Sequence, residues 1–408
     1  MRLLYITAGF PYPLTSGYLR HYFLLRHLGE RHRITLLALA GPGFTPEHAD
    51  ALRPFAEDVV AFPAARVGPW AKRWRKANAV LAGRPAPAPA ALAAAAARVL
   101  SERSYDAVLF SGKQTYPALR RLDGIPVVVD MCDAASLRID GHARVAPPSR
   151  KLPLLASRTR ARRIERRLAA AADELLFASA RDREALGLDG RGLIVPNGID
   201  LDYWRRESQA LGRAHVVFTG AMAYAPNVDA ARRLAREVMP QVRAAVPGAH
   251  LWLVGRDPAP EVAELGSLPE TTVTGLVDDV RPYLERASVF AAPLRFGAGI
   301  QNKLLEAMAM SVPSITSPLA AAGLRVDGAS APMAEADTAE EFAEAIVHAL
   351  RRADADPSPD AGARAWVSAR FSWLRSVELV EQALERAAAR RGSTPVPAGR
   401  MPVAASKP

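Results

Sequence analysis

Short apolar runs alternate with longer segments of helical periodicity along most of the chain. A first series of apolar runs covers residues 2–8, 33–39, 58–62, 106–111, 126–130 and 175–179, and a second covers residues 215–219, 250–254, 271–275, 288–292 and 313–316. Almost continuous apolar strands separated by helices are typical of parallel sheets with both faces covered. The pattern therefore predicts an α/β protein with two doubly wound, Rossmann-like domains.

Turn-forming residues gather between Gly187 and Trp204, after the last run of the first series. We place the first domain at residues 1–190 and the second at residues 191–360. Beyond them, apolar residues at spacings near three and four predict an amphipathic helix from Ala361 to about Arg390, assigned to residues 361–391, which needs a surface to cover. Residues 392–408 lack periodicity and are rich in proline, which predicts a disordered tail.

The composition is that of a globular protein in a reducing compartment. Of the 408 residues, 50% are hydrophobic and 23% are charged, which is ordinary for such a protein. The single cysteine, Cys132, excludes an internal disulfide and a zinc site built on cysteines. The first apolar run reaches glycine and proline too early for a signal peptide, and no run reaches the roughly 18 residues of a membrane span. These features predict a cytoplasmic protein.

Positive charge is concentrated in two segments of the expected first domain. The net charge is +11, and residues 150–167 hold eight basic residues and one acidic residue in a helical pattern. Residues 70–80 mix two tryptophans with four cations. Such segments suit the anionic inner face of the cytoplasmic membrane, and they are equally consistent with a solvated face in an arginine-rich sequence. No zinc-finger, RNP or helix-turn-helix pattern indicates nucleic acid as a partner.

The order of strand, glycine loop and helix between residues 288 and 317 predicts a phosphate site. Gly297 and Gly299 have no Cβ atoms, so a ligand can approach the backbone there. The helix expected from about Gln301 directs N–H groups and the positive end of its dipole toward that ligand. Lys303 in the first turn costs the helix about 0.3–1 kcal/mol, so we interpret it as placed for a bound anion.

Glu306 lies three residues after Lys303, on the same face of the expected helix. A carboxylate at this position can accept hydrogen bonds from both hydroxyls of a ribose. The two residues could equally form a surface ion pair of little energetic value. The neighbouring glycines and the strand–loop–helix order favour the nucleotide site.

Several sequence blocks in fixed order extend this interpretation to the whole chain. They are residues 2–28 (RLLYITAGFPYPLTSGYLRHYFLLRHL), 194–200 (IVPNGID), 218–227 (FTGAMAYAPN), 253–258 (LVGRDP), 273–287 (VTGLVDDVRPYLERA) and 299–310 (GIQNKLLEAMAM). In these blocks the chain resembles the family 4 glycosyltransferases, most of all sugar transferases associated with exopolysaccharide and exosortase (PEP-CTERM) systems. The resemblance implies the GT-B fold, in which two facing Rossmann-like domains enclose a deep cleft and the second domain holds a nucleotide-sugar donor.

The resemblance also implies roles in donor binding. Family members carry a Glu-x7-Glu pattern whose first acid lies near the donor sugar and whose second binds the ribose; Glu306 matches the second, and Ala298 stands at the first. The sugar contact would then come from the loop backbone, including Ile300, from Gln301 or Asn302, or not at all. The loop after Gly220 lacks the family's basic residue for the diphosphate, which leaves as candidates Lys303, Arg295 and Arg256.

Other donor positions follow from the same resemblance. Gly255 allows close approach of the nucleotide, and Leu276 and Val277 match positions whose backbone groups bind the base. Gly17, in the loop before a helix of the first domain, matches a position that approaches the donor phosphates or the acceptor.

Two carboxylates follow the apolar run 126–130. Asp130 and Asp133 are expected at the carboxyl edge of the first sheet, where open α/β sheets bind ligands. Either one of them contacts or deprotonates the acceptor hydroxyl, or both act as helix caps and turn acids. No histidine is carried over, because SGKQ at residues 111–114 stands where the family often has one.

We therefore predict a metal-independent, hexosyltransferase-like enzyme of exopolysaccharide or cell-surface glycan synthesis. It would transfer a sugar from a nucleotide-sugar donor to a saccharide or lipid-linked acceptor, with the retention that the resemblance implies. The donor is a substrate, so no cofactor is expected, and the short Asp200-x-Asp202 string does not predict a metal site. The alternatives are a sugar-nucleotide epimerase of the same architecture and a non-catalytic sugar-nucleotide-binding protein.

Overall fold

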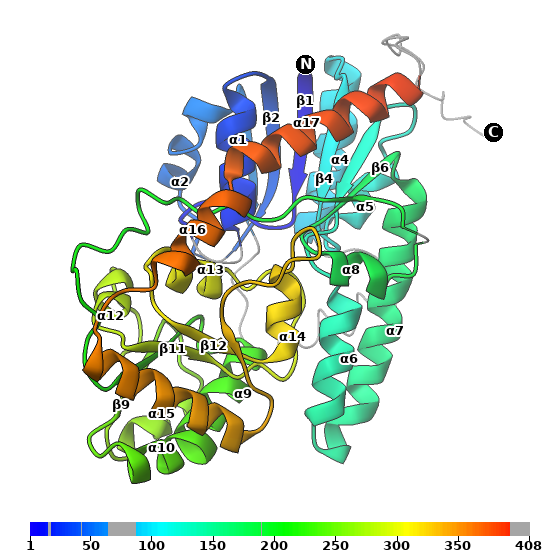
Figure 1. Cartoon of the computed structure of the whole chain (residues 1–408). Helices are drawn as coiled ribbons and strands as arrows, with labels where there is room; N and C mark the ends of the chain where they lie inside the picture. Colours follow the sequence, from blue (N-terminus) through cyan, green and yellow to red (C-terminus); the bar gives the residue numbers. More distant parts are fainter. Residues whose placement is uncertain (15–17, 42, 64–86, 189, 392–408) are drawn as a thin grey trace, which may run out of the picture.

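The computed structural model describes residues 1–14, 18–41, 43–63, 87–188 and 190–391. These residues form two α/β domains, each built on a sheet whose strand pairs are all parallel (Figure 1). The prediction of two doubly wound, Rossmann-like domains is confirmed.

The first domain contains a seven-stranded sheet in the order β3-β2-β1-β4-β5-β6-β7. Its strands are β1 (Arg2–Thr7), β2 (Arg33–Ala40), β3 (Asp58–Pro63), β4 (Ala107–Ser111), β5 (Val127–Asp130), β6 (Glu174–Phe177) and β7 (Leu193–Ile194). Its helices are α1 (Leu19–Gly29), α2 (Pro46–Asp50), α4 (Pro87–Glu102), α5 (Tyr116–Leu119), α6 (Ala135–Val145), α7 (Pro148–Ala171) and α8 (Ala180–Ala185), with a 3-10 turn at Arg53–Phe55. β7 pairs with β6, so the first sheet continues past the boundary that we expected at residue 190.

The second domain contains a six-stranded sheet in the order β10-β9-β8-β11-β12-β13. Its strands are β8 (His215–Thr219), β9 (His250–Val254), β10 (Thr271–Val273), β11 (Val289–Ala292), β12 (Ser314–Thr316) and β13 (Ala334–Glu335). Its helices are α9 (Ala225–Arg233), α10 (Met239–Ala245), α11 (Pro260–Ala263), α12 (Arg281–Glu285), α13 (Asn302–Ala309), α14 (Pro318–Ala321) and α15 (Ala339–Ala355), with a π-helical turn at Leu234–Val238 and 3-10 turns at Glu264–Ser267 and Ala322–Leu324.

The continuous helix expected from Ala361 to about Arg390 is in fact two helices, α16 (Ala361–Arg370) and α17 (Trp373–Arg390). They separate at Ser372, whose hydroxyl accepts the backbone N–H of Arg375 and so caps a new helix. α16 packs into the core of the second domain, whereas Val380 and Leu384 of α17 lie in the core of the first. Figure 1 shows α17 in red lying along the first domain.

Loops at the carboxyl ends of both sheets meet between the domains. α6 and α7 form a hairpin that runs down beside the second domain in Figure 1. His142 of α6 stacks on Phe296 in the loop after β11, with ring centroids 4.6 Å apart and planes 3° apart. The two domains are therefore in side-chain contact next to the loop in which we expect the donor phosphates.

Candidate functional site

Lys303, in the first turn of α13, points from the glycine loop toward the end of β8. Its ammonium donates a hydrogen bond to Oδ1 of Asn227 and lies 4.4 Å from the ring centroid of Phe218. A Cβ built on Gly220 would lie 3.0 Å from Lys303 Nζ. Lys303 and Gly220, which the sequence placed in separate blocks, thus lie next to each other.

Burial perturbs the two charged groups of α13 in opposite directions. Desolvation lowers the pKa of the Lys303 ammonium to about 7, while the nearby Glu306 charge acts in the opposite sense. Desolvation also raises the pKa of the Glu306 carboxyl to about 7, against the effect of Lys303. Charged groups whose pKa values are strongly shifted by burial and by a nearby charge are typical of binding and catalytic sites.

The charge of Glu306 acts on Tyr203, in the segment between the domains. The pKa of the Tyr203 phenol is raised, first by burial and then by the charges of Asp279 and, more weakly, Glu306. The guanidinium of Arg281 lies 4.0 Å from the centroid of the Tyr203 ring and donates to the Asp279 carboxylate. Tyr203, which the sequence did not single out, is therefore an aromatic side chain on whose phenol the Glu306 charge acts.

The positions expected near the base lie at the end of β10. Leu276 is 76% exposed and Val277 is partly buried against the domain core. Gly255 follows β9 with φ +150, and a Cβ there would come within 1.8 Å of the Gly220 carbonyl oxygen. Only glycine at 255 lets the loops after β8 and β9 converge in this way.

Two of the three expected diphosphate cations have other partners. Arg295 forms a two-pronged ion pair with Asp229 on α9, and Arg256 pairs with its neighbour Asp257 at 2.6 Å. Arg295 and Arg256 are both exposed. Lys303 is thus the one of the three candidates whose charged atom lies at the glycine loop and α13.

The glycine loop is bonded to the first domain. The Gly299 N–H donates to the Asp182 carboxylate of α8 at 2.9 and 3.1 Å, and the Gly297 carbonyl accepts from Arg181 at 3.2 Å. Among the remaining loop positions, Ile300 packs against the second core and Gln301 Nε2 lies 3.5 Å from the Ala298 carbonyl. The Gly299 N–H, expected to face a ligand, therefore has a carboxylate partner in this structure.

Asn302 begins α13 and is the other link to the first domain. Its Oδ1 accepts from Nδ2 of Asn197, in the linker block, at 2.8 Å. Asn197 Oδ1 in turn accepts from the Arg20 guanidinium at 3.0 Å. The start of the donor helix is thus tied to α1 through the linker.

Asp130 does not occupy the position expected of an acceptor-binding acid. Its side chain is fully buried, and both of its oxygens accept from the Arg20 guanidinium, at 2.7 and 3.2 Å. The Arg20 charge lowers the pKa of the Asp130 carboxyl against the effect of burial. Asp130 lies at the carboxyl end of β5 but is not exposed, because Arg20 of α1 packs against it.

Asp133 lies beside the loop at Gly299. Its side chain is 40% exposed, 3.8 Å from Lys113 Nζ and 4.0 Å from Arg138 Nε. A Cβ built on Gly299 would contact the Asp133 Cβ at 3.4 Å. Of the two carboxylates considered for the acceptor, Asp133 is therefore the one that adjoins the donor loop.

One group of side chains in the described residues has the spacing of a metal site, namely His21, Asp130 and Cys132, whose ligand atoms lie within 4.8 Å of one another. The donor set does not suit a cation. Arg20 already occupies both oxygens of Asp130, and burial raises the pKa of the Cys132 thiol well above its usual range, whereas a metal binds the thiolate. Asp200 accepts the backbone N–H groups of Asp202 and Tyr203, which is a turn role.

Two sequence interpretations fall on residues that the structure does not describe. Gly17 lies in the segment 15–17, and the tryptophan-rich basic stretch 70–80 lies in the segment 64–86. The expected tail, residues 392–408, is also outside the described residues.

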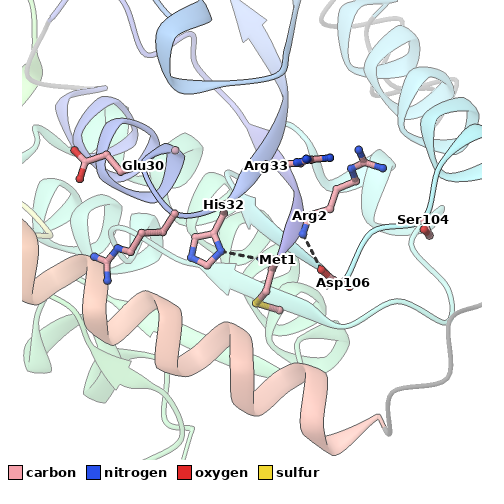
Figure 2. A pocket seen from close by; sticks show the side chains of 9 residues that line it. Met1, Arg2, Glu30, His32, Arg33, Ser104 and Asp106 are labelled. Atoms are coloured by element: carbon pink, nitrogen blue, oxygen red, sulfur yellow. Dashed lines mark hydrogen bonds between the residues drawn. The ribbon is translucent and has the colours of Figure 1, made fainter.

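An open depression of about 600 Å³ lies at the amino ends of strands in the first sheet (Figure 2). Its lining includes Met1, whose amine bonds His32, and Arg2, whose N–H donates to Asp106. Because open α/β sheets bind ligands at the carboxyl ends of their strands, we do not assign the donor to this depression.

Sequence reasoning missed the residues that join the two sides of the cleft: Arg20, Arg181, Asp182, Asn197 and Tyr203. For Asp182 a partial signal existed, because Ser179 caps α8 and accepts the N–H of Asp182, as a serine three residues before an acid at a helix start suggests. That signal explains the helix but not the bond to Gly299, which depends on how the domains meet.

The comparisons with known proteins agree with this architecture. Residues 213–352 match the family described as glycosyl transferases group 1. The structure is similar to HepE of Anabaena in complex with UDP, at 14% identity and a TM-score of 0.64, over 94% of this chain and 100% of that chain. It is also similar to sucrose-phosphate synthase of Thermosynechococcus elongatus, at 15% identity and a TM-score of 0.69, over 95% of this chain and 99% of that chain.

At these identities the structural likeness establishes the fold. A comparison with curated protein sequences gives no match. The chain thus has the fold of GT-B glycosyltransferase structures, and residues 213–352 of its second domain match the model of the group 1 glycosyl transferases.

Proposed function

We propose that the protein transfers a sugar from a nucleotide-sugar donor to a saccharide or lipid-linked acceptor, with retention of configuration, in exopolysaccharide or cell-surface glycan synthesis. An association with exosortase systems stays a prediction from the sequence resemblance. The observation that carries the proposal is the pair Lys303 and Glu306 at the start of α13, whose charged groups are buried and shifted in pKa, with the Lys303 ammonium bonded to Asn227 beside Gly220.

We place the donor nucleotide of this proposal along α13 of the second domain. Glu306 would accept the ribose hydroxyls, next to Tyr203. The diphosphate would lie at Lys303 and at the first turn of α13, where the positive end of the helix dipole favours an anion. The base would lie toward Leu276 and Val277.

Transfer then needs an acceptor hydroxyl beside the loop at Gly299. The bond between the sugar C1 and the diphosphate oxygen breaks, and a bond between C1 and the acceptor oxygen forms. The Lys303 ammonium and the positive end of α13 would stabilise the negative charge that develops on the leaving diphosphate. Asp133, exposed at the cleft and adjacent to Gly299, is our candidate for orienting the acceptor hydroxyl and receiving its proton.

We also propose that this cytoplasmic enzyme works peripherally on the inner face of the cytoplasmic membrane. The hairpin of α6 and α7 supports this idea, because Leu152 is 78% exposed and Leu155 is 42% exposed in the basic segment 150–167. Exposed leucines among cations suit an anionic lipid surface. Within the described residues, no helix is both long enough and apolar enough to cross a bilayer.

A transfer assay tests the proposal. UDP-glucose is the first donor to try, because a HepE structure was solved with UDP-glucose. The purified chain is incubated with radiolabelled UDP-glucose, and then with a panel of other nucleotide sugars, with and without a membrane extract as the source of acceptor. We expect label in an extractable product only with the extract, and a loss of that product in Glu306→Gln.

Two other outcomes would contradict the proposal. Conversion of the nucleotide sugar in the absence of extract would indicate an epimerase. Nucleotide binding by calorimetry with no transfer from any donor in the panel would indicate a binding protein.

A further inference from the structure

We propose that Asp182 is a positioning residue of the transfer site, which holds the acceptor-side loop after β5 against the donor loop after β11. The inference rests on the proposed function, since it assigns those two loops to acceptor and donor. It concerns a residue of the first domain whose partners lie in both domains.

The Asp182 carboxylate bonds both loops at once. Its Oδ1 accepts the Ala134 N–H at 2.9 Å, and its two oxygens accept the Gly299 N–H at 3.1 and 2.9 Å. The Ser179 hydroxyl, from its own helix cap, donates to Oδ2. The side chain is 0% exposed, so these protein groups take the place of water.

The two groups that Asp182 bonds flank the proposed point of transfer. Ala134 follows Asp133 directly in the chain, and the Asp133 Cβ lies at contact distance from the position that a Cβ on Gly299 would take. One buried carboxylate therefore fixes how close the acceptor-side acid comes to the donor loop, while Asp133 itself remains 40% exposed.

A second contact from the same helix supports this role. Arg181 donates to the Gly297 carbonyl at 3.2 Å, so α8 bonds the donor loop at two positions, on either side of Ala298. Ala298 has no polar side chain with which the loop could bond these groups itself. The loop conformation thus depends on α8, an element of the other domain.

Burial makes the Asp182 carboxylate depend on its hydrogen-bond partners. Desolvation raises the pKa of the Asp182 carboxyl, and the N–H groups of Ala134 and Gly299 are among the contacts that oppose this shift. If the domains separated, the carboxylate would lose its Gly299 partner. The bond is therefore favoured only when both loops are in place.

Hydrogen–deuterium exchange tests the inference without requiring turnover. In Asp182→Ala, peptides containing Ala134 and peptides containing Gly299 should both exchange faster, because each loses the acceptor of its N–H. Glu184→Gln is the matched control, since Glu184 is an exposed acid on the same helix. Unchanged exchange at Gly299 in Asp182→Ala would overturn the inference.

Kinetics then separate positioning from a purely structural role. Asp182→Ala should lower kcat about 100-fold, the scale of a misplacement of about 1 Å, while the Kd for the nucleoside diphosphate stays within twofold because Lys303 and Glu306 are untouched. Asp182→Asn keeps one carbonyl oxygen for the two N–H groups and should recover part of kcat. If circular dichroism shows that Asp182→Ala does not fold, Asp182→Asn replaces it in these measurements.

A double-mutant cycle gives the decisive result. If Asp182 acts by placing Asp133, the losses of kcat in Asp182→Asn and Asp133→Asn should not multiply in the double variant. Fully multiplicative losses would show that Asp182 acts independently of Asp133 and would overturn the inference. Wild-type protein that transfers no sugar would refute the proposed function instead, and the exchange experiment would still decide on the loop contact.

Discussion

The proposed donor side and the proposed acceptor side of the site are built in different ways. On the donor side, Gly299, Lys303 and Glu306 lie within one strand–loop–helix segment, and side chains from elsewhere, such as Asn227 at Lys303 and Asp182 at Gly299, add single contacts to it. On the acceptor side, Asp133 is positioned by α8, and its neighbour Asp130 is neutralised by Arg20 of α1. A site that is local in the chain can be found in the sequence, whereas a site assembled from distant segments needs the fold.

The largest effect should come from removing the segment that crosses back to the first domain. α17 buries Val377, Val380 and Leu384 against the core of that domain. A chain that ends after Pro357 exposes this core surface and should be insoluble on expression, because a large apolar patch on a domain promotes aggregation. A soluble, fully active truncation would show that the acceptor domain is complete without α17.

Breaking the buried ion pair of the acceptor domain should have the next largest effect. Asp130→Ala leaves the Arg20 guanidinium buried, at 6% exposure, without its counter-ion. We expect the free energy of unfolding, measured in urea, to fall by about 3–5 kcal/mol. Arg53→Ala, which removes an exposed pair with Asp50, is the control and should change it by less than about 1 kcal/mol. A small loss in Asp130→Ala would reopen an acceptor role for that carboxylate.

On the donor side, the effect of Lys303 should depend on pH. Because burial lowers its pKa to about 7, the ammonium is charged below that pH and is progressively lost above it. Wild type should therefore bind a nucleoside diphosphate more tightly than Lys303→Met by about 1.5–3 kcal/mol near pH 6, and this advantage should shrink as the pH rises through about 7 toward 9. Calorimetry of both proteins across this range provides the measurement. An advantage that is constant with pH would contradict the buried-cation account.

These two sides also show what the sequence could and could not predict. The apolar runs predicted the eleven longer strands of both sheets, because buried parallel strands are almost continuously apolar. The two-residue strands β7 and β13 were missed, since runs so short have no pattern. The break between α16 and α17 was missed as well, because the apolar spacing continues across the Ser372 cap.

For the site, local residue types predicted Lys303 and Glu306 but gave no information on partners far along the chain. Asp130 and Asp133 looked alike in sequence, and only the position of Arg20 separates them. Arg256 and Arg295 were candidates because of their charge. In the structure each forms an ion pair with an acidic residue, Arg256 with Asp257 and Arg295 with Asp229. Asp182 resembled an ordinary helix-cap acid.

We expect the smallest effect in binding to anionic membranes. Each cation near an anionic leaflet contributes about 1 kcal/mol, and this contribution decays within a Debye length of about 8 Å at physiological salt. We expect the protein to sediment with vesicles containing phosphatidylglycerol at low salt and to be released from them at high salt. It should not sediment with neutral vesicles.

The hairpin of α6 and α7 allows a sharper version of that experiment. Leu152→Ser should weaken sedimentation, whereas Leu374→Ser, which alters another exposed leucine on the C-terminal helix α17, should not. Equal and negligible binding to both kinds of vesicle would show that the positive charge reflects a bias in amino-acid composition and does not serve membrane binding.

The central claim is that the α13 segment of the second domain binds the nucleotide of a sugar donor. Its most direct test is calorimetric titration of wild type and Glu306→Ala with a nucleoside diphosphate, with the fold of each checked by circular dichroism. The account predicts a loss of about 1.5–3 kcal/mol in binding free energy, the value of hydrogen bonds to a charged group, with an unchanged spectrum. Equal affinities for the two proteins would show that Glu306 is a surface residue and would contradict the account.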